Sequence, residues 1–420
     1  MTDAVGLLRE LVSIASVTAT AGEKQAVAWV AQQLARQGIP ARLIGDPERP
    51  NLVAHLRGSD PSLRPLVLLS HLDVAPVEPS AWSHPPFGGE TEHGRLYGRG
   101  TLDTKQLTIM ELLAFCALYH GGGTRRDVYL VATADEEQGS TMGAALLAHR
   151  MPELFQKAVV LSEGGGFPLV VGGKPYLTLV VGEKCACRVR LTAKGQAGHA
   201  AAPGPEQAVV RLSAALDALL TGVEQLPPSG PVQGAMASLV GEAPDNRLAS
   251  ELLAYAGCCG VSAPPFQLGA KVNVLPATAG MALELRPLPN TSRAQVEGWL
   301  SAWLEGQAVA WEMEWFQPGI LCPPEDRLTR SVIATVEQAS RKHGLAAQAL
   351  PMLALGRTDG RFFGEGSAVF GFSPLGLMDT FDRILPMVHG NDESVSIAGF
   401  TFGCAVFAEL AARLATEVDD

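Results

Sequence analysis

Seven imidazole and carboxyl side chains stand, nearly all, where an apolar run of this sequence ends. They are His71, Asp73, Asp103, Glu136, Glu137, Glu163 and His389. Divalent ions of the zinc type take imidazole nitrogen and carboxylate oxygen as ligands, so two histidines with several acids can hold a pair of ions. A ligand position left open for water then allows hydrolysis. Each acid taken alone is more readily explained as a helix cap or a solvated loop residue, but the whole set predicts a two-metal hydrolytic site.

Short apolar runs flanked by glycine, proline or a charge have the pattern of buried strands. They lie at residues 66–69, 128–131, 158–161 and 368–372, and candidate ligands follow the first three. Helical stretches separate these three runs, and this alternation predicts an α/β fold with a mainly parallel sheet and helices on both faces. Such sheets bind ligands outside the carboxyl ends of their strands. We therefore expect the candidate ligands to meet at one edge of the sheet.

Two candidates precede predicted helices instead. Asp103 lies between the turn Gly98-Arg99-Gly100 and a helix predicted over residues 105–119. His389 comes before a helix predicted over residues 394–416. From the start of a helix each side chain can project toward the strand ends.

The sequence pattern changes between residues 181 and 316. An alternating strand pattern at 185–191, helices over 205–220 and 292–306, and strands over 271–274, 281–285 and 309–315 are predicted there. The order β-α-β-β-α-β is that of a split-βαβ layer, and the proline- and glycine-rich tract 226–265 is an elaboration within it. Since His389 follows this layer, we expect an inserted domain at 182–316 within a catalytic domain made of residues 1–181 and 317–420. Two domains also suit 420 residues, which exceed what one core usually supports.

Composition excludes several classes of protein. The chain is 47% hydrophobic with a net charge of -11, so disorder, nucleic-acid binding and attachment to anionic membranes are not expected. The first fifteen residues lack the basic start and unbroken apolar core of a signal peptide, which predicts a cytoplasmic protein. No apolar stretch of roughly twenty residues runs without charge or glycine, so no membrane span is expected. The seven cysteines show no C-x-x-C spacing and are expected to be free thiols.

Short motifs spread over almost the whole chain resemble those of the di-zinc aminoacylase and glutamate carboxypeptidase family. They are S-H-L-D-V at 70–74, G-R-G-T-L-D-T-K at 98–105, D-E-E at 135–137, S-E-G-G at 162–165, G-Q-A-G-H-A-A-A-P at 195–203, N-V-L-P at 273–276 and H-G-N-D-E at 389–393. That family includes succinyl-diaminopimelate desuccinylase, acetylornithine deacetylase and N-acyl amino acid hydrolases. The resemblance implies a di-zinc exopeptidase fold with an inserted α+β lid and dimerisation domain.

The resemblance also implies a ligand set for two zinc ions. Asp103 would bridge them, with His71 and Glu163 completing one coordination sphere and Glu137 and His389 the other. Cobalt or manganese could occupy the same ligands.

Two further acids have roles in the family pattern. Asp73 would accept the imidazole proton of His71 and so fix its tautomer. Glu136 would act as general base, taking a proton from the attacking water and passing one to the leaving amine. The resemblance further implies a cis peptide bond after Asp103.

Candidate substrate contacts lie later in the chain. His199 would reach from the insert of a partner subunit to stabilise the oxyanion, which implies a homodimer through the insert. As an alternative, His199 caps its own loop. Arg286 and Arg361 are candidates for two-point binding of a substrate carboxylate, and Asn273 and Gly356 for amide and backbone contacts.

The loop at residues 356–360 departs from the family pattern at one position. Arg357 stands where small residues are common. This leaves the shape of the substrate pocket open, and Arg357 could instead pair with a surface acid.

The predicted function is metal-dependent hydrolysis of the amide of a short peptide or N-acyl amino acid. Two other classes remain: a catalytically silent metal-dependent binding protein, and a related di-zinc aminopeptidase without a lid. Glu136 argues against the first because binding alone needs no base, and the inserted domain argues against the second. Dipeptidase, carboxypeptidase and deacylase activities are not separable from these residues.

Overall fold

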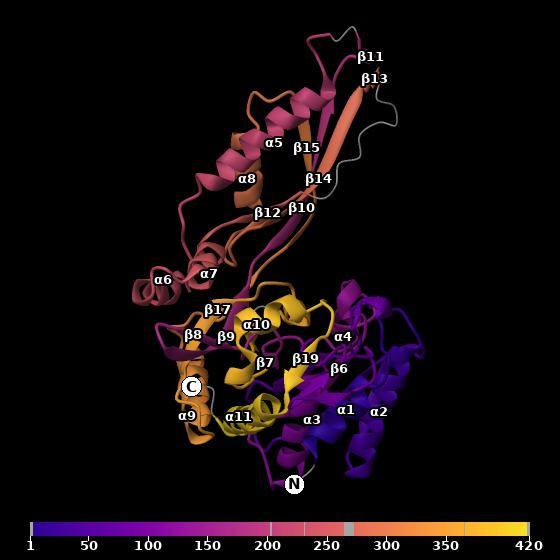
Figure 1. The fold of residues 1–420 in the computed structure, drawn as a ribbon, viewed down its shortest axis with the longest axis vertical. Helices are drawn as coiled ribbons and strands as arrows, with labels where there is room; N and C mark the ends of the chain where they lie inside the picture. The colour runs from indigo at the N-terminus through magenta and orange to yellow at the C-terminus, as the bar shows by residue number, and fades with distance from the viewer. Residues whose placement is uncertain (1–2, 202–203, 231, 264–272, 365, 418–420) are drawn as a thin grey trace. The chain divides into compact units, whose positions relative to one another are not determined.

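The computed structural model describes residues 3–417 except 202–203, 231, 264–272 and 365. The chain divides into two compact units (Figure 1). Unit 1 is formed by residues 1–182, 241–248 and 322–420, and unit 2 by residues 183–240 and 249–321.

Unit 1 is built on a mixed sheet with a parallel centre. Its strands are β1 (Ala41–Asp46), β2 (Arg49–Leu56), β3 (Leu66–His71), β6 (Val128–Thr133), β7 (Val159–Ser162), β8 (Pro168–Val171), β9 (Lys174–Glu183), β17 (Gln348–Leu353) and β18 (Ala368–Gly371). Their order is β1-β2-β6-β3-β7-β18-β9, with β8 and β17 also paired to β9. Strands β6, β3, β7 and β18 run parallel to one another, which confirms the expected fold class.

The four apolar runs of the sequence are these central parallel strands. Every residue of β3 is buried, because a central strand has both faces covered. Continuous hydrophobicity, not alternation, is the pattern that such a strand leaves in a sequence.

The helices of unit 1 are α1 (Ala4–Val12), α2 (Gly22–Arg36), α3 (Lys105–His120), α4 (Ala144–Arg150), α9 (Arg327–Lys342), α10 (Phe381–Ile384) and α11 (Ile397–Thr416). Several of them pack on the sheet. Helix α2 contacts β1 and β2, α3 contacts β3 and β6, and α9 contacts β17. The short elements are η1 (Pro79–Ala81), β4 (Thr91–Glu92), β5 (Arg95–Tyr97), η2 (Glu136–Gln138), β16 (Ile320–Leu321), η3 (Asp359–Phe362), η4 (Leu377–Asp379), η5 (Leu385–Met387) and β19 (Ser394–Ser396).

The last helix begins later than the sequence pattern predicts. Residues 394–396 form β19, which pairs with β5, and α11 begins at Ile397 because the Ser396 side chain accepts the backbone N–H of Gly399. Among the described helices, α11 alone has the length and composition of a membrane span. Its buried face contacts α3 and α9 within unit 1, as a core helix does.

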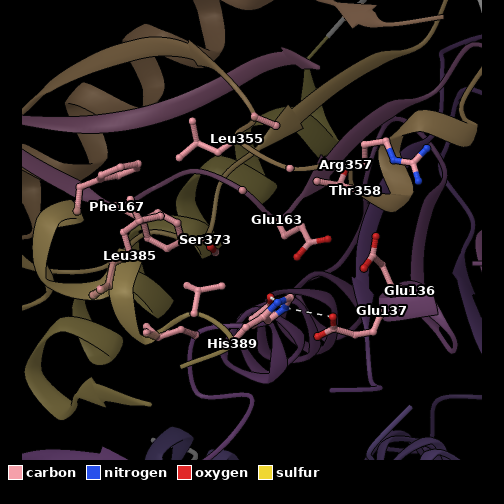
Figure 2. Close-up of a pocket in the computed structure, with 18 residues that line it drawn as sticks. Glu136, Glu137, Glu163, Phe167, Leu355, Arg357, Thr358, Ser373, Leu385 and His389 are labelled. Atoms are coloured by element: carbon pink, nitrogen blue, oxygen red, sulfur yellow. Dashed lines mark ion pairs between the residues drawn. The ribbon is translucent and has the colours of Figure 1, made fainter. Parts of the chain in front are cut away.

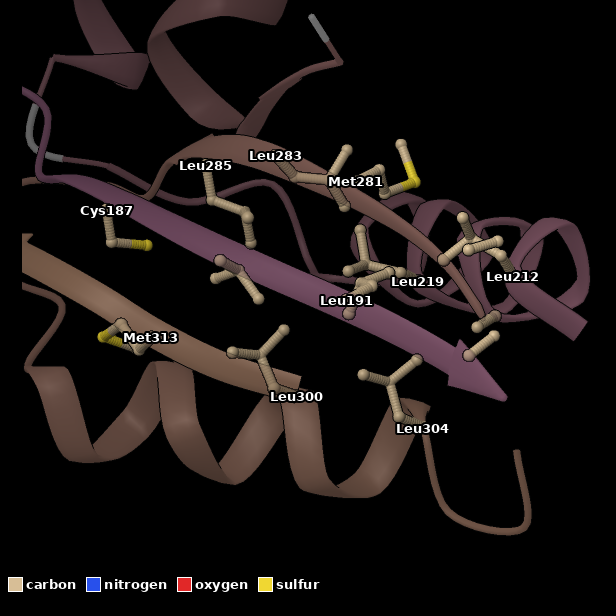
Figure 3. Close-up of a cluster of buried hydrophobic side chains, with 14 of the residues drawn as sticks. Cys187, Leu191, Leu212, Leu219, Met281, Leu283, Leu285, Leu300, Leu304 and Met313 are labelled. Atoms are coloured by element: carbon tan, nitrogen blue, oxygen red, sulfur yellow. The ribbon is translucent and has the colours of Figure 1, made fainter. Parts of the chain in front are cut away.

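Unit 2 has its own four-stranded antiparallel sheet. Strands β12 (Gly260–Ser262), β14 (Thr278–Arg286), β10 (Ala186–Lys194) and β15 (Val309–Gln317) lie in that order. Helices α5 (Ala208–Glu224) and α8 (Arg293–Trp303) supply Leu212, Leu219 and Leu300 to a core shared with Leu191 and Leu283 of the sheet (Figure 3). A capping box between Ser292 and Gln295 begins α8.

One strand of unit 2 differs from the prediction. Of the expected 271–274 strand, Val274 lies in β13 (Val274–Leu275), which pairs with β11 (Gly198–His199) outside the four-stranded sheet. Asn273 lies in a turn, and Lys271 and Val272 lie outside the described residues. The outer strand is β12, within the tract read as an elaboration, where Val261 lies opposite Leu285 and packs against the core. The same tract contains α6 (Gln233–Glu242) and α7 (Arg247–Gly257).

All seven cysteines lie within the described residues and are free thiols, as expected. Cys185, Cys187 and Cys322 are buried and Cys258 is exposed.

Candidate metal centre

Three adjacent strands bring candidate ligands to one edge of the sheet in unit 1. β3 ends at His71, β6 is followed closely by Glu136 and Glu137, and β7 ends directly before Glu163. Because β3 lies between β6 and β7 and parallel to both, their carboxyl ends point the same way.

Two groups of three side chains share Asp103. His71 Nε2 lies 3.0 Å from Asp103 Oδ1 and 3.4 Å from Glu163 Oε2. His389 Nε2 lies 3.2 Å from Asp103 Oδ2 and 3.1 Å from Glu137 Oε2. In each group the potential ligand atoms lie within 4.8 Å of one another. The two oxygens of Asp103 thus face different histidines, as those of a bridging ligand would.

The acids of the site strongly favour positive charge on both imidazoles. Burial alone would lower the pKa of His71, but Glu163 and then Asp103 raise that pKa well above its ordinary value. Hydrogen bonds with Asp103 and Glu137 raise the pKa of His389 to about 10. Burial alone would raise the pKa of Asp103, yet the contacts with His389 and His71 hold it below its ordinary value.

The donor set fits divalent cations. Imidazole nitrogen and carboxylate oxygen are ligands for zinc-type ions. Oε1 of Glu137 is buried and has no hydrogen-bond partner in the described part of the chain. A buried acceptor without a donor is uncommon in proteins and calls for an explanation such as a bound ion.

Asp103 lies in the turn between β5 and α3. Gly100 has φ +93°, in the left-handed region that favours glycine. The peptide bond between Asp103 and Thr104 is cis, which confirms that expectation.

Glu393 holds this turn in place. It is fully buried, and its Oε1 accepts the backbone N–H groups of Gly100, Leu102 and Asp103 at 2.6–3.2 Å. Its Oε2 pairs with Arg99 at 2.6 Å. Glu393 ends the H-G-N-D-E string, but nothing in the string indicates this contact with a turn about 290 residues earlier.

Asp73 supports the loop that carries the two adjacent glutamates. Its Oδ1 accepts the N–H of Glu136 at 3.0 Å and its Oδ2 accepts the N–H of Glu137 at 3.1 Å. The Asp73 carboxylate lies 3.5 Å from His71 Nδ1, whereas the Asp73 backbone oxygen lies 2.9 Å from that nitrogen. The backbone oxygen is therefore the closer partner of His71, and the carboxylate mainly orders the glutamate loop.

Glu136 belongs to neither ligand group but lines the same cavity. Burial, and then the charge of Glu163, raise its pKa well above the ordinary value. Burial also raises the pKa of Glu163 to about 7. Oε1 of Glu136 pairs with Arg361 at 3.1 Å.

The cavity beside the ligands has a volume of about 240 Å³. Its polar end carries the carboxylates, and Gly356, Arg357, Thr358 and Ser373 also line it (Figure 2). Its apolar wall consists of Phe167, Leu355, Phe381, Ile384, Leu385 and Val388. The cavity can therefore place an uncharged apolar group next to the candidate ligands.

The substrate-binding candidates are not brought together by the described contacts. Gly356 lines the cavity, whereas Arg361, whose side chain is 5% exposed, does not line it. Arg286, in unit 2, pairs with Glu284 at 2.6 Å, and Asn273, also in unit 2, is exposed.

His199 is exposed in β11 of unit 2. Its Nδ1 accepts the backbone N–H of Ala201 at 3.1 Å. This is the loop contact of the alternative reading, and it leaves Nε2 available for another partner.

The parallel centre of the sheet gathers histidine and carboxylate groups at its carboxyl edge, and these groups form a candidate metal site of the kind that metallohydrolases use. Residues 67–413 match the model of Peptidase family M20/M25/M40, so the chain belongs to this family. The match confirms the resemblance seen in the motifs. Members of the family are hydrolases that act on peptides or N-acyl amino acids, and this chain is accordingly a hydrolytic enzyme of amide bonds.

Individual relatives span most of the chain. N-fatty-acyl-amino acid synthase/hydrolase PM20D1 of Bos taurus is 27% identical over 378 residues, covering 82% of this chain and 73% of the relative. Aminoacylase-1 of Sus scrofa is 25% identical over 422 residues, covering 98% and 95%. Among solved structures, the M20 family metallo-carboxypeptidase Sso-CP2 of Sulfolobus solfataricus superposes with a TM-score of 0.73 at 18% identity, covering 98% and 99% of the two chains.

Proposed function

We propose that this protein hydrolyses the amide of an N-acyl amino acid or short peptide with two divalent cations, zinc in the first place, and Glu136 as general base. One observation carries the proposal: two ligand groups share Asp103, and a carboxylate that belongs to neither group lies beside them. His71 and Glu163 would hold one ion together with Asp103, and Glu137 and His389 the other. Cobalt or manganese would fit the same donors.

Amide hydrolysis needs a group beside the cations that can carry a proton from the attacking water to the leaving amine. Cations bound here would lower the pKa of a water molecule to about 7 and polarise the amide carbonyl. Glu136 takes a proton from the water as the water oxygen bonds to the carbonyl carbon. It then gives a proton to the amide nitrogen as the C–N bond breaks.

The apolar wall of the cavity narrows the substrate class. An N-acyl amino acid carries its charge on the amino-acid carboxylate, whereas its acyl group is uncharged and can lie against Phe167, Phe381 and Val388. A short peptide places a charged amine or polar groups there, which burial against apolar side chains disfavours. The names of PM20D1 and aminoacylase-1 point to the same substrate class, so we place N-acyl amino acids with apolar acyl groups first.

The remaining predictions extend this proposal to unit 2. We propose that the insert acts as a lid and dimerisation domain, and that His199 of one subunit completes the oxyanion site of another in a homodimer. Nε2 of His199, which has no hydrogen-bond partner among the described residues, supports this role. Arg286 and Asn273 remain candidates for binding the substrate in that assembly.

A metal analysis combined with a matched substrate panel tests the proposed function. The panel holds one amino acid constant as its N-acetyl, N-octanoyl and N-dodecanoyl derivatives and as a dipeptide, and released amine is measured. We expect two metal ions per chain, hydrolysis that chelation abolishes and zinc restores, and kcat/KM that rises with acyl length. Faster hydrolysis of the dipeptide than of every acyl compound would overturn the substrate class. Absence of hydrolysis throughout the panel by the metal-loaded chain would overturn the function.

A further inference from the structure

Arg361 makes a direct contact with the carboxylate that we assign as general base. Its Nη1 donates to Oε1 of Glu136 at 3.1 Å and to the backbone oxygen of Thr358 at 2.6 Å. The two side chains are 5% and 13% exposed. Hydrogen bonds between charged groups shielded from water are stronger and more directional than exposed ones.

The arginine is itself held by the loop that carries Glu136. Its Nη2 donates to Oγ of Ser140 at 2.8 Å. Ser140 in turn donates to Oδ1 of Asp359, whose Oδ2 accepts the hydroxyl of Thr133 at 2.6 Å. Thr133 is the last residue of β6, so this chain of hydrogen bonds connects the arginine to the central sheet.

This geometry gives Arg361 a task distinct from binding substrate. Both N–H bonds of Nη1 are used within the protein, the side chain is buried, and Arg361 does not line the cavity. A guanidinium that engages one oxygen of a carboxylate restrains the position of that oxygen and leaves the second oxygen for another proton.

We propose that Arg361 is a positioning residue, which holds Oε1 of Glu136 so that Oε2 stays available to the attacking water. The inference rests on the proposed function, because it concerns the orientation of the proposed base. It assigns Arg361 an action through Glu136, in place of the predicted contact with a substrate carboxylate.

Steady-state kinetics of Arg361→Gln and Arg361→Lys test the inference. Displacing a reacting group by about 1 Å can cost about 100-fold in rate, so Arg361→Gln should lower kcat by about 10- to 100-fold while KM stays within about 3-fold. Metal content should be unchanged. Arg361→Lys keeps a charged donor and should recover part of kcat. Arg413→Gln is the matched control: Arg413 pairs with Glu417 near the end of α11 and is 59% exposed, and its loss should leave kcat and KM unchanged.

The Glu136→Gln background separates positioning from other roles. If Arg361 acts through the carboxylate of Glu136, adding Arg361→Gln to Glu136→Gln should change neither the residual kcat nor the substrate affinity measured by calorimetry. A weaker substrate affinity in the double variant would assign Arg361 to substrate binding and overturn the inference. The inference would also be overturned if Arg361→Gln lowered kcat by the same factor in the Glu136→Gln background as in the parent enzyme.

Two outcomes distinguish the inference from the function on which it rests. An active parent enzyme whose Arg361→Gln variant keeps its kcat overturns only the positioning role. A parent enzyme that hydrolyses nothing in the panel overturns both. Should Arg361→Gln fail to fold, Arg361→Lys gives the same comparison, alone and in the Glu136→Gln background. A kcat of Arg361→Lys equal to that of the parent counts against the positioning role. A further loss of kcat in the double variant, relative to Glu136→Gln, also counts against it.

Discussion

The same substitution at two adjacent residues should separate the base from a metal ligand. Glu136 contacts Arg361 through Oε1, whereas Glu137 places Oε2 3.1 Å from His389 Nε2 and leaves Oε1 buried without a hydrogen-bond partner among the described residues. Glutamine has nearly the same shape as glutamate but carries no charge and cannot take a proton from water. Glu136→Gln and Glu137→Gln therefore change the chemistry at each position with little change in packing.

The two substitutions should change different quantities: Glu136→Gln should lower kcat, and Glu137→Gln should lower metal affinity. Removing a general base costs about 10²–10⁴-fold in kcat, or about 3–5 kcal/mol of transition-state stabilisation. Glu136→Gln should show this loss with unchanged metal content, since Glu136 is outside both ligand groups. Loss of a residue that merely hydrogen-bonds to a metal ligand lowers metal affinity by about 10–100-fold. Because Glu137 is itself a proposed ligand, Glu137→Gln should lower the affinity for the ion beside His389 by at least that factor.

The assay measures metal per chain after dialysis at fixed free zinc and kcat as free zinc is increased. Glu136→Gln should keep its low kcat at every zinc concentration, whereas Glu137→Gln should regain activity as added zinc refills its site by mass action. Loss of metal in Glu136→Gln, or a kcat within about tenfold of the parent value, would refute the assignment of these roles. Two variants that behave alike would refute it as well.

Three further outcomes are expected. Leu283→Ala, at a fully buried position of β14 in unit 2 (Figure 3), should lower the free energy of unfolding in urea by about 2–5 kcal/mol. Val210→Ala, at a position of α5 that is 59% exposed, should change this free energy by less than about 0.5 kcal/mol. Equal effects of the two substitutions would contradict the core assignment. Burial lowers the pKa of Lys105 to about 7, against about 10.4 in an unfolded chain. The unfolded chain thus binds more protons between these values, and the parent should gain stability relative to Lys105→Met as pH rises from 7 to 10; a stability difference that is flat over this range would contradict the shift. Chelation should lower the melting temperature and zinc should restore it, because ions that bind only the folded state add about 4 kcal/mol at a thousand times their Kd; an unchanged melting temperature would show that no stabilising ion is bound.

The central sheet and the positions of the candidate ligands could be predicted from the sequence for a physical reason. A parallel strand covered on both faces needs consecutive apolar residues, as residues 66–69 and 128–131 show, and its end is where polar groups can again reach water or a ligand. An acid or histidine directly after such a run therefore carries positional information. His71 and Glu163 are of this kind.

Contacts between residues far apart in the sequence could not be predicted in this way. Strand β12 replaced the expected strand in the sheet of unit 2 because Val261 packs opposite Leu285, and its three residues are too short to produce a periodic pattern. The carbonyl oxygen of Asp73, not its carboxylate, proved the closer partner of His71. No spacing in the sequence distinguishes a backbone from a side-chain oxygen of the same residue.

Arginine–carboxylate pairs help to hold the segments around the ligand edge in position. Pairs between segments of unit 1 that are distant in the sequence include Arg49–Asp135, Arg95–Asp379, Arg99–Glu393 and Arg361–Glu136, at 2.6–3.1 Å. The carboxylate side chains of these pairs are at most 13% exposed. Such pairs add little net stability compared with apolar packing, but removing one partner leaves a buried charge and costs about 3–5 kcal/mol. They are therefore suited to fixing one arrangement of the loops, and two of them fix residues that we assign to the site or its supporting turn: Glu136 directly, and Asp103 through Glu393.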